Sequence, residues 1–434
     1  MTMDTIFALG TGAARSAIGV IRLSGPRVRQ ALDDFAGSLP EPRVARFTAF
    51  RDPASGEMLD QGLALFFPAP HSATGEDYAE FQIHGGRAVI DGLLGALARR
   101  PGLRMAEPGE FARRGFANGK LDLSQAEALA DLVDAQTQAQ CRQALRIASG
   151  ALRRQIEGWR AALIDALALV EAELDFSDEA DVGPFNAKRL RAILAPTYAE
   201  MLAALRTAPA SERMREGFLV MIMGPPNAGK STLLNALARR DLAIVSPTPG
   251  TTRDMIEAHL DLDGLPVTFV DTAGLREAAD EIERIGVDRV LERVETADLV
   301  LWLSAGGAEA FNESASGADV LRVASKSDVS PAPPGWLALC ATSGAGLDSL
   351  LREISPRAGA RLGDGASALF IRERHRVAAE SAAASVESAL ALEKDLEFIA
   401  EDLRSAARSL GRIVGAVDVE DVLDVVFSRF CIGK

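Results

Sequence analysis

The sequence predicts a multidomain protein: an α+β domain comes first, a helical bundle follows, and an α/β domain is inserted into that bundle. Three observations support this architecture. The chain of 434 residues is too long for one ordinary hydrophobic core. Its pattern changes from short strand-like runs to helical stretches, then to alternating strands and helices, and then back to helices. Such an insertion is permitted because the two ends of a domain usually lie close together.

Each change of pattern marks an expected boundary. The first segment holds short apolar runs such as IGVIRL, LALFF and EFQIHGG between Gly- and Pro-rich turns, which predicts strands. The second is rich in Ala, Leu and Glu with helical spacing, and Ser124 with Glu127 forms a candidate capping box at its start. The third alternates strands with helices, and the fourth is helical again. The segments are residues 1–117, 118–215, 216–357 and 358–434.

The composition restricts the class of protein. A net charge of −14 argues against a protein that coats nucleic acid non-specifically, although the run RERHR at 372–376 is a candidate basic patch. The alternative for that run is a solvated helix face. Three cysteines far apart in sequence suggest neither a disulfide framework nor a zinc site, and a reducing cytoplasm fits best. No apolar run approaches the roughly 18 residues of a membrane-spanning helix, and the N-terminus lacks an export signal.

A phosphate-binding loop begins the third segment. GPPNAGKS, from Gly224 to Ser231, fits G-x-x-x-x-G-K-[ST] and stands between the apolar run FLVMIM and a helical stretch. Backbone N–H groups of such a loop surround phosphate oxygens, the lysine reaches the β- and γ-phosphates, and the serine binds Mg²⁺. The nucleotide-binding residues expected here are Asn227, Ala228, Gly229, Lys230, Ser231 and Thr232.

Two later motifs are typical of nucleotide switches. In VTFVDTAGL an apolar strand delivers Asp271 towards the metal, and Gly274 can offer its backbone N–H to the γ-phosphate. Between the loop and this strand lies SPTPGTTRD, in which Thr252, or alternatively Thr251, can complete the Mg²⁺ coordination.

The base-reading motif indicates GTP. VLRVASKSDV stands where Ras-like domains carry N-K-x-D, so Asp328 would accept hydrogen bonds from guanine and the stem of Lys326 would pack along the ring. Ser325 replaces the usual Asn. LCATSGAGL matches the loop that closes over the base, through Cys340, Ala341 and Thr342, with Cys340 in place of the usual Ser. A P-loop ATPase is the alternative, against which Asp328 argues.

The group that activates water is open from the residues alone. Leu275 occupies the position at which Ras-like proteins place a water-orienting Gln, so another side chain must serve. Glu277, Glu281 and Glu283 are the acidic candidates in the stretch that follows. Asn227 either binds a monovalent cation beside the phosphates or caps the turn.

These motifs together resemble the MnmE (TrmE) family of tRNA-modification GTPases. The resemblance is carried by GPPNAGKS, PGTTRD, DTAGLRE and the terminal FCIGK, and by IGVIRLSG, TGEDYAEFQIHGG, PGEFARRGFANGKLDLSQAEALADL and VDVEDVLDVVFSRFCIGK. It runs from end to end of the chain. A regulatory or ribosome-assembly GTPase that shares only the nucleotide-binding domain is the alternative.

The resemblance implies a fold, an activity and a site. It implies a homodimer through a folate-binding-like N-terminal domain that holds 5-formyltetrahydrofolate or a related one-carbon folate. It also implies an FAD-dependent partner in a heterotetramer, and addition of an aminomethyl or carboxymethylaminomethyl group to C5 of the wobble uridine (position 34) of certain tRNAs. The implied residues are Arg22, Glu80, Lys120 and Lys434 for folate; Asn227, Ser246, Thr248 and Thr251 for K⁺; Ser231 and Thr252 for Mg²⁺; and Glu283 to orient water.

The C-terminal CIGK presents two interpretations. A cysteine four residues from the end invites comparison with a prenylation box, but Gly433 is not aliphatic and no polybasic run precedes Cys431. The apolar helical sequence before it suggests a tail docked on the protein. The resemblance implies that Cys431 is a candidate nucleophile or ligand beside the folate, and we expect Lys434 to make a charged contact there.

Overall fold

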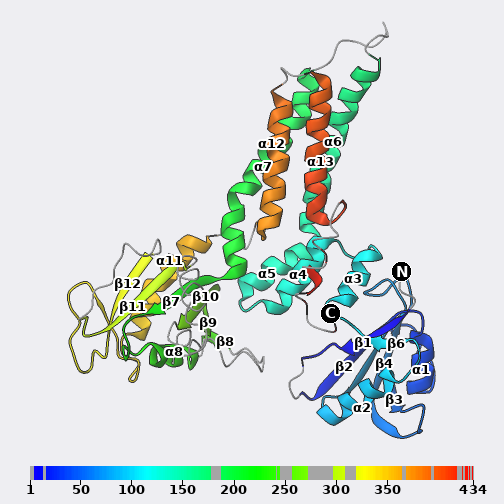
Figure 1. Ribbon diagram of the computed structural model, residues 1–434, viewed down its shortest axis with the longest axis horizontal. Coiled ribbons are helices and arrows are strands. Elements are labelled where there is room, and N and C mark those ends of the chain that lie inside the picture. The colour runs from blue at the N-terminus through cyan, green and yellow to red at the C-terminus, as the bar shows by residue number, and fades with distance from the viewer. Residues whose placement is uncertain are drawn as a thin grey trace, which may run out of the picture. The chain divides into compact units, whose positions relative to one another are not determined.

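The computed structural model describes residues 4–12, 16–176, 187–240, 242–244, 257–271, 297–307, 319–363, 368–391 and 395–417, together with 423, 426–428, 430 and 433 (Figure 1). The chain divides into two compact units, which are described one at a time. The first comprises Met1–Ala130 and Gly411–Lys434, and the second Asp131–Leu410. The four sequence boundaries stay predictions. Among the described residues, no helix is both long and apolar enough to cross a membrane.

The first unit contains a six-stranded sheet of order β3-β4-β5-β2-β1-β6, in which only the β1–β6 pair is parallel. Helices α1 (Val28–Ala36) and α2 (Arg87–Ala98) pack on one face over Phe7, Phe50 and Phe81. Because strand residues alternate between faces, Ile6 instead packs with Phe111 of α3 (Glu110–Ala117) on the other face. The strands are β1 Thr5–Leu9, β2 Ile18–Ser24, β3 Arg46–Arg51, β4 Met58–Phe67, β5 Tyr78–His84 and β6 Leu103–Met105. They confirm the expected α+β domain.

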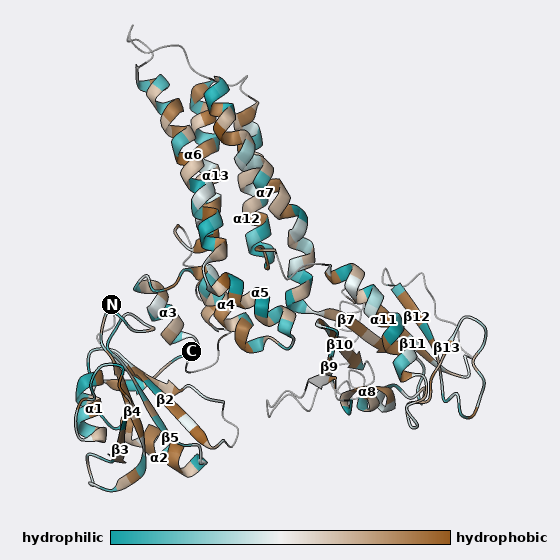
Figure 2. Cartoon of the chain, turned by 180° about the vertical axis from the view of Figure 1, so that it is seen from behind, coloured by the Kyte–Doolittle hydropathy of each residue, from teal (hydrophilic) through white to brown (hydrophobic). Residues whose placement is uncertain are grey.

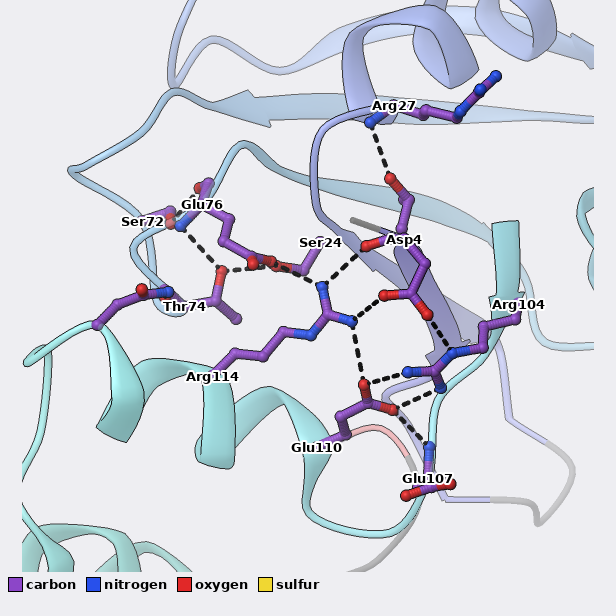
Figure 3. Close-up of polar contacts among 12 residues, drawn as sticks. Asp4, Ser24, Arg27, Ser72, Thr74, Glu76, Arg104, Glu107, Glu110 and Arg114 are labelled. Atoms are coloured by element: carbon purple, nitrogen blue, oxygen red, sulfur yellow. Dashed lines mark hydrogen bonds and ion pairs between the residues drawn. The ribbon is translucent and has the colours of Figure 1, made fainter. Parts of the chain in front are cut away.

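An ion-pair network ties α3 to the sheet (Figure 3). Arg114 is 8% exposed, and its guanidinium lies 3.0 Å from carboxylate oxygens of Asp4, Glu76 and Glu110. Glu110 also accepts two hydrogen bonds from Arg104, of 2.6 and 2.8 Å. A buried guanidinium is stable only when its donors are satisfied in this way.

Helix α4 (Leu123–Asp134) begins differently from the expectation. The capping box is formed by Asp122 and Gln125: the Asp122 carboxylate accepts from the Gln125 N–H at 2.9 Å, and the Gln125 amide oxygen accepts from the Asp122 N–H at 3.0 Å. The prediction of Ser124 and Glu127 is wrong by two residues, because both of those side chains are buried inside the first turns of the helix.

Long helices form much of the second unit (Figures 1 and 2). Thr137 and Gln140 form a capping box that starts α5, and this break separates α5 from α4. Helix α7 packs against both α6 and α12. The bounds are α5 Gln138–Ala148, α6 Ala151–Phe176, α7 Ala187–Glu216, α12 Glu373–Leu390 and α13 Leu396–Val414, the last of which continues into the first unit.

The inserted α/β domain is built on a seven-stranded sheet of order β13-β12-β11-β7-β10-β9-β8. The five strands β13, β12, β11, β7 and β10 are parallel to one another. Strands β9 and β8 extend the sheet beyond β10 in antiparallel pairs. Helices α8 (Lys230–Ala238) and α11 (Leu347–Leu362) contribute to its core. The strands are β7 Phe218–Met223, β8 Ala243–Ile244, β9 Glu257–Leu262, β10 Leu265–Asp271, β11 Leu299–Ala305, β12 Asp319–Ser325 and β13 Leu337–Ala338. The fold class predicted from sequence is confirmed.

The two chain crossings between the helices and the inserted domain lie side by side. Arg215, at the end of α7, donates from Nε to the carbonyl oxygen of Ile371 at 3.1 Å. Asp131 of α4 accepts from Arg372 at 2.7 Å and lies 3.8 Å from Arg215. The insertion therefore leaves and re-enters the helical part at one place, as the sequence pattern predicts.

Candidate functional site

The loop after β7 has the backbone geometry of a phosphate-binding loop. Gly224 has φ +149°, and a Cβ there would lie 2.1 Å from the carbonyl oxygen of Leu303, so the position requires glycine. Asn227 adopts φ +61°, which asparagine tolerates better than most residues. Gly229 begins α8 with φ +92°. The loop therefore connects the end of a parallel strand to the start of a helix, and the unpaired N–H groups of that first turn are available to bind an anion.

Lys230 and Ser231 are the first two residues of α8. The Lys230 Nζ lies 3.0 Å from the carbonyl oxygens of Gly224 and Pro225, so the ammonium is folded over the loop. The Ser231 hydroxyl donates to Oδ2 of Asp271 at 2.7 Å. Asp271 is 1% exposed at the end of β10. A hydroxyl and a buried carboxylate side by side suit a hard divalent cation such as Mg²⁺.

The base-reading motifs come together at the ends of β12 and β13. The Ser327 N–H donates to the carbonyl oxygen of Leu339 at 3.1 Å, and the Leu339 N–H donates to that of Ala324 at 2.9 Å. These bonds bring the segment holding Lys326 and Asp328 beside the Cys340 loop. Both charged side chains are exposed, as groups that meet a nucleotide must be.

Ser325 and Cys340 depart from the usual motifs, and both are 3% exposed. The Ser325 hydroxyl makes no hydrogen bond within the described residues. The Cys340 thiol lies 3.2 Å from the Thr342 hydroxyl. Hydrogen bonds from Ser343 and then Thr342 lower the pKa of this thiol, and the Asp328 carboxylate acts in the opposite sense. Cys340 thus interacts with the carboxylate that would read guanine.

The first unit brings part of the expected folate set together. Arg22 of β2 stands opposite Glu80 of β5 in the sheet register, and the Arg22 Nε lies 3.8 Å from the Glu80 carboxylate. The Arg22 Nη1 donates to the carbonyl oxygen of Gly433 at 3.0 Å. Gly433 is buried, has φ +96°, and would place a Cβ 2.1 Å from the carbonyl oxygen of Leu9. Gly433 is therefore docked on β1 and β2.

Aromatic packing holds the tail before that point. Phe427 and Phe430 are 2% and 7% exposed, and their ring centroids are 5.7 Å apart. Phe427 also packs on Phe116 of α3, at 6.4 Å between centroids. Lys120 is exposed near Gly75, and no contact with Arg22 or Glu80 is found among the described residues.

Several expected site residues lie outside the described residues: Ser246, Thr248, Thr251, Thr252, Gly274, Leu275, Glu277, Glu281, Glu283, Cys431 and Lys434. One site residue was missed by the sequence analysis. The Tyr78 hydroxyl donates to Glu80 at 3.3 Å, and burial raises the pKa of the phenol well above its usual value. The signal was available, since residues two apart on a strand share a face.

A phosphate-binding loop, a Ser–Asp pair beside it and a guanine-type base loop define a P-loop GTPase whose nucleotide domain is inserted into a helical domain. The family model "MnmE helical domain" matches residues 123–431, and "GTP-binding protein TrmE N-terminus" matches residues 5–120. The chain belongs to the MnmE (TrmE) family of tRNA modification GTPases. It binds GTP and acts as a GTPase in tRNA modification.

Curated relatives match over the whole chain. The "tRNA modification GTPase MnmE" of Beijerinckia indica is 52% identical over 100% of this chain and 96% of its own length. That of Azorhizobium caulinodans is 51% identical over 99% of each chain. An alternative that shares only the nucleotide domain does not account for these matches.

Solved structures of GTP-binding proteins match part of the chain. The G domain of the T. maritima FeoB iron transporter is 21% identical, covering 32% of this chain and 98% of that one, with a TM-score of 0.25. Aquifex aeolicus Era bound to GDP·AlF4⁻ is 25% identical, covering 32% of this chain and 56% of that one, also with a TM-score of 0.25.

Proposed function

We propose that this chain uses GTP hydrolysis to drive addition of an aminomethyl or carboxymethylaminomethyl group to C5 of the wobble uridine (position 34) of certain tRNAs. It does so with an FAD-dependent partner in a heterotetramer, as a homodimer in the cytoplasm. The observation that carries the proposal is the docking of the C-terminal tail beside Arg22, in the same unit as Glu80. A GTPase switch alone has no use for such a site.

The residues around Arg22 suit a folate such as 5-formyltetrahydrofolate. The N–H groups along one edge of its pterin ring can donate hydrogen bonds to a carboxylate. Its glutamate carries carboxylates that a cationic side chain can bind. Glu80 supplies the carboxylate, and Tyr78 donates to it through its hydroxyl. Arg22 lies 3.8 Å from Glu80, so it would meet an oxygen at the same end of the ligand. The buried Arg22 Nε makes no hydrogen bond within the described residues, so it has a donor to offer. Lys120 and Lys434 complete the proposed set.

A bound one-carbon folate supplies the carbon that reaches uridine. The residues named above would bind and orient this donor, and the buried Gly433 packs against Leu9 of β1 beside them. Cys431 stands two positions before Gly433 in the sequence, and Gly433 accepts the hydrogen bond from Arg22. We assign Cys431 to the chemistry there, as a nucleophile or a ligand.

The phosphate loop suits two cations. Ser231 and Thr252 would hold Mg²⁺, with Asp271 accepting from the Ser231 hydroxyl as it does here. Asn227, Ser246, Thr248 and Thr251 would hold K⁺, which supplies positive charge where other GTPases use an arginine. The left-handed backbone of Asn227 supports this role, because it sets the residue at the exposed top of the loop. Glu283 would orient the attacking water.

Nucleoside analysis tests the proposal. Transfer RNA from a strain that lacks the gene is digested, and its wobble nucleosides are identified by mass spectrometry. We expect the C5-substituted uridines to disappear, to return with the parent gene, and to stay absent with Cys431→Ser. Normal C5-substituted wobble uridines in the deletion strain would reject the proposed reaction. Loss of these nucleosides with normal modification by Cys431→Ser would reject only the role of the thiol.

A further inference from the structure

The net charge of −14 means that any surface of this chain that attracts the phosphates of tRNA is a local one. The basic run 372–376 does not provide one. Arg372 is paired with Asp131, and Arg376 with Glu212, Glu373 and Glu380. These arginines are engaged with carboxylates, so they hold the helices together and have little attraction left for phosphate.

A different group of arginines lies on α5 and at the start of α6, in the second unit. Arg142 and Arg146 are one turn apart on α5, so they share a face of that helix, and both are exposed. Arg154, exposed in the first turn of α6, donates to the backbone carbonyl oxygen of Ser149 at 2.9 Å. No Asp or Glu occurs from residue 135 to residue 156.

Arg146 and Arg154 converge on one depression of about 510 Å³ between α5, α6 and α7. Its wall also contains Gln155, Trp159, Thr197 and Glu200. Glu200 is occupied by neutral donors, since it accepts from the Trp159 Nε1 at 2.9 Å and from the Gln155 Nε2 at 3.2 Å. The nearby Glu157 is paired with Arg153 at 2.7 Å. Two arginines, Arg146 and Arg154, thus line the depression against the one carboxylate of Glu200, and Arg142 lies one turn from Arg146 on α5.

We propose that Arg142, Arg146 and Arg154, here called the α5–α6 arginine surface, bind the phosphate backbone of tRNA. Guanidinium groups bind phosphate through two parallel hydrogen bonds, and one that donates to a neutral carbonyl keeps its full charge for this purpose. Such contacts position an RNA without reading its sequence. The proposal rests on the tRNA-modifying activity of the family, and not on the folate, potassium or wobble-position assignments.

The test compares tRNA binding by the full chain and by the variant R142Q/R146Q/R154Q. The probe is a fluorescein-labelled, unmodified tRNA transcript with a wobble uridine, and its anisotropy is measured from about 50 to 200 mM salt. Each lost phosphate contact lowers the log–log salt slope by about 1, so we expect a slope smaller by about 3 and a dissociation constant roughly tenfold higher or more.

Arg352→Gln is the matched control. Arg352 is an exposed helical arginine of α11 that donates to the carbonyl oxygen of Asp348 at 3.3 Å, so its replacement removes one arginine charge and a contact similar to that of Arg154. We expect parent-like binding from this variant. R142K/R146K/R154K keeps the charges but loses the paired donors of guanidinium, so it should keep the parent salt slope.

Three results would overturn the proposal. The triple variant could bind tRNA with the affinity and salt slope of the parent, or Arg352→Gln could lose as much affinity as the triple variant. The triple variant could also bind tRNA like the parent and fail only to bind the FAD-dependent partner. If the triple variant melts below the assay temperature, R142Q/R146Q decides, with a slope smaller by about 2. A chain that binds tRNA through this surface but leaves wobble uridines unmodified would refute the proposed reaction while supporting the surface.

Discussion

Arg22 and Gly433, separated by 411 positions in the sequence, are joined by a hydrogen bond of 3.0 Å from the guanidinium to the backbone carbonyl oxygen. The bond closes the first unit, because it ties the last residues of the chain to the second strand of the sheet. It also places the tail beside a cross-strand Arg–Glu pair. The folate proposal depends on this contact. The contact can be tested by adding one methyl group at Gly433.

Gly433→Ala should undock the tail. The added Cβ would lie 2.1 Å from the carbonyl oxygen of Leu9, and φ +96° is itself unfavourable for alanine. We expect weaker binding of 5-formyltetrahydrofolate, by at least roughly tenfold, measured by calorimetry. Gly37→Ala is the control, since Gly37 has φ +81° with nothing within 4 Å of the added Cβ. Equal folate affinity in the two variants would show that docking of the tail does not contribute to folate binding.

Replacing Na⁺ with K⁺ should strongly raise GTP turnover if Asn227 ligates a monovalent cation. Asn227→Gly isolates the side chain, because glycine keeps the φ of +61° without strain while removing the amide oxygen. We expect this variant to lose the difference between the two salts. Turnover is measured by phosphate release in matched KCl and NaCl. A K⁺ response that survives in Asn227→Gly would show that this oxygen is not a ligand.

Glu283→Ala should abolish GTP hydrolysis with little change in GTP affinity, because the proposed role of Glu283 is to orient water and not to bind nucleotide. Single-turnover phosphate release and nucleotide titration separate the two effects. Glu277→Ala is the control, and it should hydrolyse GTP at the parent rate. A large loss of GTP affinity in Glu283→Ala would count against the assignment.

Ser325→Asn should tighten guanine nucleotide binding. Ser325 is buried and its hydroxyl makes no hydrogen bond within the described residues, so the usual Asn would restore a contact worth about 1 kcal/mol. The expected dissociation constant for GDP is lower by roughly fivefold. Ser327→Asn, two residues away and less buried, serves as the control. No gain from Ser325→Asn would mean that another group already makes this contact.

Glu110→Gln should destabilise the first unit in a pH-dependent manner. Burial raises the pKa of Glu110, but hydrogen bonds from Arg104, the Glu107 N–H and Arg114 outweigh it and hold the pKa below the usual 4.5. A carboxyl group with a lowered pKa in the folded state adds stability above that value, and the contribution is lost as pH falls through the folded-state pKa. At neutral pH we expect a loss of about 3 kcal/mol.

The measurement is thermal unfolding of parent and variant at several pH values. The gap in melting temperature should be full at neutral pH and narrow below pH 4.5. Glu107→Gln is the matched control, since the Glu107 side chain is exposed and only its backbone N–H meets Glu110. If the difference in melting temperature did not change with pH, the lost stability would come from packing of the side chain and not from its charge.

The parts of the structure that local sequence determines were predictable. The apolar runs FLVMIM, VTFVD and VLRVAS each lie in a strand that ends at or directly before its motif, because an apolar run followed by a Gly-rich or polar turn leaves few alternatives. The helix start at Asp122 was missed because two overlapping patterns, DLSQ and SQAE, both satisfy the capping rule. Burial of Ser124 and Glu127 chose between them, and burial is a property of the tertiary fold.

Contacts between distant segments were not readable from the sequence. Nothing local shows that Arg22 meets Gly433, or that Arg372 is neutralised by Asp131, since each pair is far apart in the chain. The basic run 372–376 illustrates the consequence: composition suggests a positive patch, whereas the fold surrounds it with carboxylates.

The hydrogen bond between Arg215 and the carbonyl oxygen of Ile371 makes the nucleotide domain excisable. Its two attachment points are already within bonding distance, so a linker of a few residues could rejoin α7 to α12 with little cost in loop entropy. The shortened chain would keep the first unit and the helical part of the second, and would lack the GTPase domain. Conversely, another small domain whose ends lie close together could be inserted at the same place. A conformational change in that domain would then act on α7 and α12 at its two attachment points.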